Sequence, residues 1–463
     1  MNSMNNNRSE RKYRVLSLFS GGMGLDLGLG FTDRFETVAC VEKVPTFCKT
    51  IRLNQQKGRL SQSLKIIEAD ISQLSPEQVL DDLGLQAEDI DVIVGGPPCQ
   101  TFSTAGKRGT TQDPRGTLLW DFLRFVEYIR PKLFLMENVR GLLSAALIHR
   151  PIADRPEKGG LPLSEDEKPG SVVRLFASDL AKIDGASYHL DIFEVNSVNY
   201  GAPQIRERAL FIGNRYNLQV EFPAPTHGQI NPGNNSASQP SLFDDVKLQP
   251  WKTLGDAIAN MQEEIPTVLD FSPRKKRYLG LVPPGSNWRS LPEELQKESM
   301  GKAWFAKGGR SGWWRRLTFD LPCPTLITMP NHASTSLCHP TETRALSIRE
   351  YARIQEFPDE WEFVGTTSEQ YRQVGNAVPT RLGVIAGNVI ADTLKKISAR
   401  QIQSVSVNSS EPRIVYVQSH VRTRQWFKNG KVVIWDDNKD NGGAAYGKPK
   451  TKRKVRGLES RGA

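Results

Sequence analysis

Short apolar runs and amphipathic stretches alternate along the first part of the chain. Runs rich in Val, Ile and Leu, each ending at glycine or a polar residue, predict buried strands. They lie at 14–19, 38–41, 64–68, 91–94 and 132–136. Before the last of them, apolar residues recur at helical spacing at Leu118, Leu119, Phe122, Phe125, Val126 and Ile129. Strands that alternate with helices are typical of a doubly wound, mainly parallel sheet, so the pattern predicts an α/β fold.

This rhythm breaks from about 215 to 340, where proline, tryptophan and basic residues become frequent. The stretch predicts a smaller, irregular second domain. Helical periodicity returns at 344–357 and 379–397, and we assign these helices to the first domain. The predicted parts are, in chain order, a disordered N-terminus 1–13, the large domain 14–214, the irregular domain 215–340, a return to the large domain 341–399 and a basic tail 400–463.

Three shorter stretches have their own patterns. The polar, Pro/Gly-rich residues 149–171 predict a surface insertion. In the tail, residues 413–418 alternate like a strand, and Asn429-Gly430 between two apolar runs predicts a β-hairpin. Residues 447–463 have the composition of a disordered segment.

Composition narrows the class of protein. Five scattered cysteines without zinc spacing predict neither a metal site nor a disulfide framework, and they fit a reducing compartment. We see no secretory signal and no apolar stretch long enough to span a bilayer, so we expect a cytoplasmic protein. The net charge is +10, and residues 400–463 carry +9 of it, with 14 Lys and Arg against 5 Asp and Glu. Nucleic acid is the usual partner of such an asymmetry, and a solvated tail is the alternative.

The turn after the first predicted strand, Phe19-Ser20-Gly21-Gly22-Met23-Gly24, opens a helix. Such a turn lets the backbone approach a nucleoside cofactor closely. Glu42 ends the second strand and suits a pair of ribose hydroxyls, and Asp70 follows the third strand and suits the exocyclic amine of adenine. Each acid taken alone is as readily a helix cap. Their order behind a glycine turn predicts a cofactor that contains adenosine.

The fourth predicted strand ends at Gly95-Gly96-Pro97-Pro98-Cys99-Gln100. The two prolines fix φ, so the turn holds one thiol stiffly at the sheet edge where ligands bind in open α/β sheets. This placement suits a nucleophile, and a buried structural cysteine is the alternative. Glu137-Asn138-Val139 ends the fifth strand, and Gln204, Arg206 and Arg208 share one face of an extended segment.

The ordered set of motifs resembles the DNA cytosine-5 methyltransferase family. The family pattern has a glycine-rich cofactor turn, Pro-Cys-Gln, Glu-Asn-Val, Gln-x-Arg-x-Arg, a helix of the type seen here at 349–353, and Gly-Asn-Ala-Val-Pro, here at 375–379. The resemblance covers about residues 14–213 and 344–395. It implies the Rossmann-like fold of S-adenosylmethionine-dependent methyltransferases. Met23 departs from the consecutive glycines usual in the family, which predicts a constrained backbone in the first turn.

The resemblance implies a role for each motif. Cys99 is expected to attack carbon 6 of a target cytosine, so that carbon 5 can accept the methyl group of S-adenosylmethionine. Glu137 is expected to contact ring N3 and the exocyclic amine, with Arg206 and Arg208 completing the catalytic set. The expected cofactor contacts are Phe19, Gly21, Gly24, Glu42, Asp70, Ile71, Pro98, Asn376 and Val378. No metal is expected.

The resemblance also implies duplex DNA as the substrate and a target base that is flipped out of the helix. The irregular domain then becomes a target-recognition domain. Residues 302–316 interleave five basic residues with four aromatic ones and no acid, which suits phosphate contacts and groove insertion. An exposed basic loop over a small aromatic core is the alternative. The expected DNA contacts are Gln100, Ser103, Arg310, Arg315 and Arg316.

We therefore predict a bacterial-type DNA (cytosine-5)-methyltransferase that is a monomer and acts alone or beside a separate restriction endonuclease. Two alternatives stay open: a tRNA cytosine-5 methyltransferase of the same lineage, and a catalytically silent DNA-binding relative. The long irregular domain argues against the first, and the intact Cys99, Glu137 and Arg206 argue against the second. The tail from about 400 is expected to add DNA affinity outside the catalytic site.

Overall fold

The chain falls into two compact units, Met1–His420 and Val421–Ala463. The structure is a computed structural model that describes residues 11–98, 117–229, 248–305, 311–405 and 411–417, with two further strands at 426–428 and 431–433. We describe each unit by itself.

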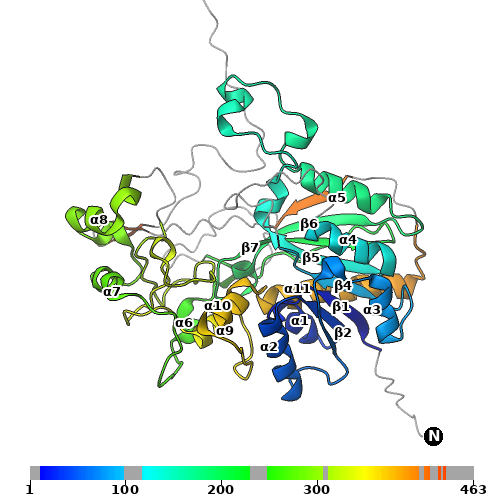
Figure 1. The fold of residues 1–463 in the computed structure, drawn as a ribbon, viewed down its shortest axis with the longest axis horizontal. Helices are drawn as coiled ribbons and strands as arrows, with labels where there is room; N and C mark the ends of the chain where they lie inside the picture. The colour runs from blue at the N-terminus through cyan, green and yellow to red at the C-terminus, as the bar shows by residue number, and fades with distance from the viewer. Residues whose placement is uncertain are drawn as a thin grey trace, which may run out of the picture. The chain divides into compact units, whose positions relative to one another are not determined.

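A sheet of eight strands forms the centre of the first unit (Figure 1). Its order is β10-β6-β7-β5-β4-β1-β2-β3. The strands are β1 (Tyr13–Leu18), β2 (Phe35–Glu42), β3 (Lys65–Glu68), β4 (Val92–Gly95), β5 (Leu133–Val139), β6 (His189–Asn196), β7 (Glu207–Asn214) and β10 (Arg413–Tyr416). Strand β7 is antiparallel to both of its neighbours, and the other neighbouring pairs are parallel. The predicted α/β fold with a mainly parallel sheet is confirmed.

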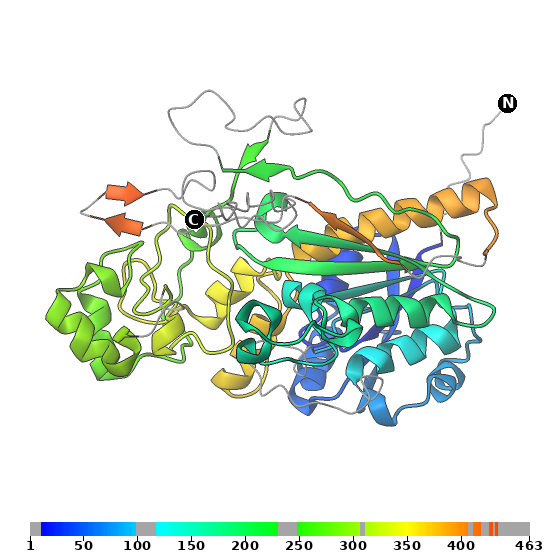
Figure 2. The same ribbon diagram turned by 90° about the horizontal axis from the view of Figure 1, so that it is seen from above.

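Helices cover both faces of this sheet (Figure 2). They are α1 (Gly24–Gly30), α2 (Pro45–Gln56), α3 (Pro76–Leu83), α4 (Leu118–Ile129), α5 (Ser171–Ala181) and α11 (Thr380–Arg400). Side chains alternate along each strand, so Ile93 and Phe134 pack with apolar residues of α3, α4 and α5. Val92 and Leu133 point to the other face and pack with α1 and α11. The two buried faces explain why the strands read as continuous apolar runs.

The stretch between β7 and α11 is irregular, as predicted. It holds two-residue strands, β8 (His227–Gly228) and β9 (Gln249–Pro250), and short helices. The helices are α6 (Leu254–Ile258), α7 (Pro273–Gly280), α8 (Glu293–Met300), α9 (Ile348–Ile354) and α10 (Thr367–Asn376). Tyr278, Trp288 and Trp314 centre a small core there, and a further core joins α6 to α9, α10 and the start of α1. A division into domains at 215 and 340 stays a prediction.

The tail departs from the prediction. The strand expected at 413–418 is β10, and it pairs in parallel with β6 at the edge of the large sheet. Arg413 Nε lies 2.6 Å from Oδ1 of Asp191, a carboxylate that is 0% exposed. The predicted boundary at 400 is therefore wrong, because residues 411–417 complete the sheet. Alternation along four residues predicts a strand but not the strand that it pairs with.

The second unit contains the predicted hairpin. Strands β11 (Trp426–Lys428) and β12 (Lys431–Val433) are antiparallel, and Lys428 pairs with Lys431 around Asn429-Gly430. The insertion at 149–171 contains three short 3₁₀ helices and is closed by an Arg150–Glu167 ion pair. The disorder predicted at 447–463 and for most of 1–13 lies outside the described residues, and Tyr13 already belongs to β1.

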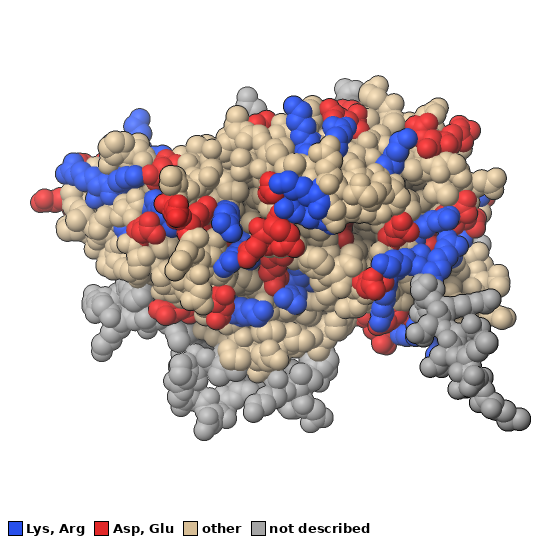
Figure 3. Space-filling view, turned by 90° about the horizontal axis from the view of Figure 1, so that it is seen from below, with Lys and Arg blue, Asp and Glu red and all other residues tan. Residues whose placement is uncertain are grey.

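Both signs of charge are mixed on the face of the molecule that Figure 3 shows, where basic and acidic side chains are interspersed. None of the helices in the described ranges combines the length and the apolar character needed to cross a membrane.

Candidate active site and cofactor pocket

The ends of β4 and β5 lie side by side at the carboxyl edge of the sheet. Gly95 pairs with Met136, and a Cβ atom on Gly96 would stand 3.3 Å from Glu137 Oε2. Asn138 Nδ2 donates a hydrogen bond to the Pro97 carbonyl at 3.0 Å. The backbone that leads towards Cys99 is thus tied to the Glu-Asn-Val motif. Pro98 is exposed, whereas Cys99, Gln100 and Ser103 lie outside the described residues.

Glu137 meets Arg208 at this edge. The Glu137 side chain is largely buried, and its Oε1 forms an ion pair with Arg208 Nε. Val139 pairs with Arg208 across the antiparallel β5 and β7, so Glu137 and Arg208 are diagonal neighbours on one face of the sheet. The two side chains are both largely buried, so each is the other's partner at this edge. The structure therefore brings these two predicted catalytic residues together.

Arg206 is used inside the protein. The residue is 2% exposed, and its Nη1 and Nη2 donate to the carbonyls of Leu326 at 3.1 Å and Gly375 at 2.8 Å. Burial, with a smaller contribution from nearby Arg208, lowers the pKa of Arg206 well below its usual value. Its Nε has no hydrogen-bond partner among the described residues. The guanidinium thus holds the segment before α11 by hydrogen bonds to its carbonyl groups. Its Nε–H group is the donor that makes no such bond.

Gln355 completes this network and is absent from the predicted site. Gln204 Nε2 donates to Gln355 Oε1 at 2.9 Å, and Gln355 Nε2 donates to the carbonyls of Val374 at 2.7 Å and Ala377 at 3.1 Å. The predicted Gln-x-Arg-x-Arg and Gly-Asn-Ala-Val-Pro motifs are joined through it. The sequence signal for Gln355 is its position directly after the motif helix at 349–353.

The glycine turn approaches the last helix closely. Gly21 has φ +54°, and a Cβ atom on Gly24 would stand 2.2 Å from the Val378 carbonyl oxygen. Met23 has φ +66° and is 1% exposed, so the departure from the family pattern does place a side chain in left-handed backbone. Val378 lies beside the turn, and Asn376 is the exposed last residue of α10. Phe19, also in left-handed backbone, is half-buried at the mouth of the turn.

Glu42 links the turn to the start of α2. Its carboxylate accepts hydrogen bonds from the backbone N–H groups of Gly21 and Val44, each at 2.8 Å. Burial raises the pKa of Glu42, and these N–H donors oppose the rise. Each oxygen of a carboxylate has further acceptor capacity, so Glu42 can still receive a hydroxyl.

Asp70 caps the short 3₁₀ helix η1 (Ile71–Gln73) and also keeps free surface. Its Oδ1 accepts from Ser72 N at 3.1 Å, and its Oδ2 pairs with Lys43 Nζ at 2.5 Å. The hydrogen bond from Lys43 lowers the pKa of Asp70. The cap considered as an alternative is thus observed, and 28% of the side chain remains exposed. Ile71 is buried in the core.

The residues around the glycine turn fit a cofactor that contains adenosine. A close-packed glycine turn and two carboxylates follow β1, β2 and β3, which are adjacent in the sheet. Carboxylates accept hydrogen bonds from ribose hydroxyls and from an adenine amine, and a half-buried phenyl ring offers a stacking face. The residues present are therefore compatible with S-adenosylmethionine.

One predicted DNA contact is wrong. Arg316 is 5% exposed, and its guanidinium donates to the carbonyls of Leu279, His339, Pro340 and Glu342. It holds an irregular segment together where regular backbone pairing is missing, and it is unavailable to a phosphate. Trp314, a candidate for groove insertion, is 1% exposed and belongs to the same core, as the alternative interpretation held.

Arg315 differs from its neighbour. It is half-buried, burial lowers the pKa of Arg315, and its guanidinium has no hydrogen bond or ion pair within the part of the chain that the structure describes. Arg310 lies outside the described residues.

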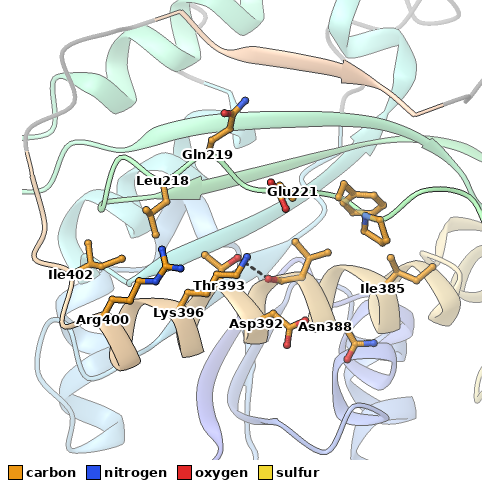
Figure 4. A pocket seen from close by; sticks show the side chains of 13 residues that line it. Leu218, Gln219, Glu221, Ile385, Asn388, Asp392, Thr393, Lys396, Arg400 and Ile402 are labelled. Atoms are coloured by element: carbon orange, nitrogen blue, oxygen red, sulfur yellow. Dashed lines mark hydrogen bonds between the residues drawn. The ribbon is translucent and has the colours of Figure 1, made fainter. Parts of the chain in front are cut away.

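A cavity beside α11 is separate from the candidate site residues. It lies between the extended segment after β7 and the outer face of the helix, as Figure 4 shows. Leu218 and Glu221 line one wall, and Asn388, Asp392 and Lys396 line the other. None of the candidate site residues borders it. Over the described residues, no cluster of three or more His, Cys, Asp or Glu side chains has the arrangement of a metal site.

Comparison with known proteins gives consistent matches. The sequence profile of the C-5 cytosine-specific DNA methylases matches residues 13–151 and 163–392. The chain is 36% identical over 396 residues to Type II methyltransferase M.Sau96I of Staphylococcus aureus, covering 85% of this chain and 79% of the relative. It is 35% identical over 399 residues to Type II methyltransferase M.Eco47II of Escherichia coli, covering 85% and 82%.

A solved structure shares the fold. It is that of a proposed DNA modification methyltransferase encoded within an E. coli prophage. The TM-score is 0.52 at 22% identity, with 83% of this chain and 100% of the other covered.

Proposed function

Because the chain belongs to the C-5 cytosine-specific DNA methylases and is therefore a DNA (cytosine-5)-methyltransferase, we propose that it methylates a flipped-out cytosine through a covalent Cys99 adduct. The family is S-adenosylmethionine-dependent. The observation that carries the proposal is the meeting of the β4 and β5 ends, where Asn138 holds Pro97 and the Glu137–Arg208 pair lies beside Gly96.

The Cys99 thiolate would add to carbon 6 of the cytosine ring, and the electron pair of the 5,6 double bond would move towards carbon 5. Glu137 would hold N3 and the exocyclic amine and limit the negative charge on the ring by hydrogen bonding. Carbon 5 would then take the methyl group, whose bond to the sulfonium sulfur would break and leave a neutral thioether. Loss of the carbon 5 proton would return electrons to the ring and expel the thiolate.

Arg208 would keep Glu137 in place through their ion pair, and the unpartnered Nε of Arg206 is the donor left for the base or the thiol. A free thiol is mostly protonated at neutral pH, so nearby cations would favour the thiolate. Both arginines are buried at the edge where Cys99 is expected, which supports these roles.

We assign the cofactor pocket to Phe19, Gly21, Gly24, Glu42, Asp70, Ile71, Pro98, Asn376 and Val378. The cofactor supplies an electrophilic methyl group when bound. Glu42 would orient it through ribose hydroxyls, and Asp70 would accept from the adenine amine. Gly21 allows the left-handed backbone of the turn, and Gly24 allows the turn to lie against the Val378 carbonyl.

We place DNA against the irregular region and against Gln100 and Ser103. Arg315 supports this placement, because its charge is partly desolvated without an anionic partner among the described residues. Arg310 stays in the proposed set, and Arg316 leaves it. Extruding the target base costs a few kcal/mol of stacking, which protein contacts must offset.

The relatives are named Type II methyltransferases, which favours duplex DNA over tRNA and a restriction endonuclease as a separate companion. The decisive experiment is methyl transfer from labelled S-adenosylmethionine to duplex DNA and to tRNA, with Cys99→Ser as control. A duplex with 5-fluorocytosine at the target should trap an adduct at Cys99. Labelling of tRNA alone, turnover by Cys99→Ser, or an adduct at Cys323 or Cys338 would refute the proposal.

A further inference from the structure

Arg124 joins helix α4 to the segment that carries Asp70. Its Nη1 donates to the Leu74 carbonyl at 2.8 Å, and its Nη2 donates to the Ile71 carbonyl at 2.6 Å. Asp121, one turn earlier on α4, accepts from the same Nη2 at 3.1 Å. The fork of the guanidinium therefore grips both ends of η1 at once, while its own helix orients it.

The gripped segment has little other support on its outer side. Strand β3 is four residues long, is the last strand of the sheet and is partly exposed along its length. Helix η1 is a single three-residue turn whose cap is Asp70 itself. Short edge elements open locally at low free energy. Two hydrogen bonds from a charged donor are a strong restraint on such a turn.

The position of Asp70 depends on this turn. The carboxylate of Asp70 accepts from the backbone and hydroxyl of Ser72, so its orientation is set from within η1. Lys43, from the loop after β2, pairs with the other oxygen, and the Lys43 side chain is 70% exposed. An exposed ion pair contributes little. The Arg124 fork therefore links the Asp70 turn to the helical layer, beside the buried side chain of Ile71.

We propose that Arg124 is a positioning residue for recognition of the adenine base: it holds η1 so that Asp70 faces the exocyclic amine. The inference rests on the proposed cofactor pocket. It predicts a specific defect. Loss of the fork weakens adenine recognition and leaves the ribose, the amino-acid end and DNA binding to the other residues.

The test uses the full-length protein and two nucleoside ligands, measured by calorimetry. One is S-adenosylhomocysteine, and the other is its inosine analogue, in which oxygen replaces the exocyclic amine. The wild type should prefer the adenosine ligand. In Arg124→Gln, the Kd for S-adenosylhomocysteine should rise about tenfold, because charge-assisted hydrogen bonds are lost. The Kd for the inosine ligand should change about twofold or less, so that the preference shrinks.

Arg124→Lys retains the charge without the fork and should show the same loss of preference, and it serves if the glutamine variant does not fold. Glu127→Gln, at an exposed position on the same helix, is the matched control and should behave as wild type. In an Asp70→Ala background, Arg124→Gln should reduce the preference no further, since the residue that reads the amine is already gone.

Four outcomes overturn the inference. Equal weakening of both ligands assigns Arg124 a general structural role. Unchanged affinity for both ligands shows that η1 holds without the fork. A further loss of preference in the Asp70→Ala background shows that Arg124 acts through another residue. If the wild type itself binds both ligands equally, the Asp70 assignment in the proposed function fails, and the inference fails with it.

Discussion

At the level of single residues, the site depends on charges that are buried in pairs. Glu137 and Arg208 are each 9% exposed and face each other across β5 and β7. Removing one member of a buried pair leaves the other charge without compensation. A substitution of Glu137 can therefore lower stability as well as remove the proposed catalytic role, and the two effects have to be measured separately.

Glu137→Gln should lower kcat by about 10²- to 10⁴-fold, because an amide cannot supply a proton to the ring or carry the charge. The amide can still accept from Arg208. The free energy of unfolding should therefore fall by less than the roughly 3–5 kcal/mol typical of a broken buried pair. Single-turnover methyl transfer and urea unfolding measure the two effects. A variant that methylates normally would remove Glu137 from the catalytic set.

Asp26 is a buried carboxyl group in the first turn of α1, 4% exposed and hydrogen-bonded by Ser17 Oγ at 3.0 Å. Burial raises the pKa of Asp26 to about 7. The folded state therefore favours the protonated form of Asp26. The free energy of unfolding falls as pH rises from about 4 towards 7 and slightly beyond. The full loss is on the order of 4 kcal/mol.

We expect Asp26→Asn to remove this pH dependence. The unfolding free energy of the variant should gain on that of the wild type steadily between pH 5 and pH 8. Urea titrations at several pH values measure the difference, and Asp184→Asn, at an exposed position, is the control. Parallel curves for wild type and Asp26→Asn would mean that the carboxyl group is ionised in the fold at all these pH values.

The sequence identifies a site residue more reliably when the end of a single strand determines where that residue lies. Glu42 and Glu137 lie near the carboxyl ends of their strands, Asp70 comes just after its strand, and a parallel sheet brings such residues to one edge. Gln355 and Arg124 could not be found in this way, because their roles arise from contacts between distant segments. Arg316 is misread for the opposite reason: a basic stretch predicts charge at the surface, and only packing reveals that carbonyl groups surround one of its arginines.

At the level of elements, α1 and α11 pack with almost no space between their backbones. A Cβ atom on Gly28 would stand 2.3 Å from the Thr380 carbonyl oxygen and 2.6 Å from Gly383 Cα. The same contact sets Val378 against the glycine turn.

Strands and helices with strong apolar patterns can be predicted from the sequence. Neither β6 nor α10 is anticipated from the sequence, and the partner of β10 is decided by tertiary pairing.

Gly28→Ala should lower the free energy of unfolding by roughly 1–3 kcal/mol, because the added methyl group meets rigid backbone. Gly30, at the exposed end of the same helix, has no atom within 4 Å of an added Cβ. Gly30→Ala should therefore be neutral or stabilise by up to about 1 kcal/mol through helix propensity. Chemical denaturation compares the pair, and equal effects would show that the two helices can move apart freely.

At the level of the whole molecule, most of the net positive charge lies outside the unit that contains the large sheet. Residues 421–463 carry 12 Lys and Arg against 4 Asp and Glu, a net charge of +8 out of +10. The face in Figure 3 mixes both signs of charge. The matched family region ends at residue 392, before β10 and before this basic unit. β10 of the tail completes the sheet, and we propose that the basic residues beyond it attract DNA.

Two truncations separate these functions. A chain ending at residue 420 keeps β10 and should stay folded, methylate the same target sequence and bind all DNA more weakly. Its salt dependence should flatten by about 0.9 log units of slope per lost phosphate contact.

A chain ending at residue 400 also loses Arg413 and leaves buried Asp191 without its arginine, so it should unfold more easily. Arg413→Ala in the full-length chain should reproduce that instability with the DNA salt slope unchanged. Salt titrations of DNA binding, read beside thermal melting, distinguish the cases. Equal affinity and equal slope for the full chain and the 420 truncation would make residues 421–463 a solvated extension or a docking module, and an altered target sequence would mean that they read bases.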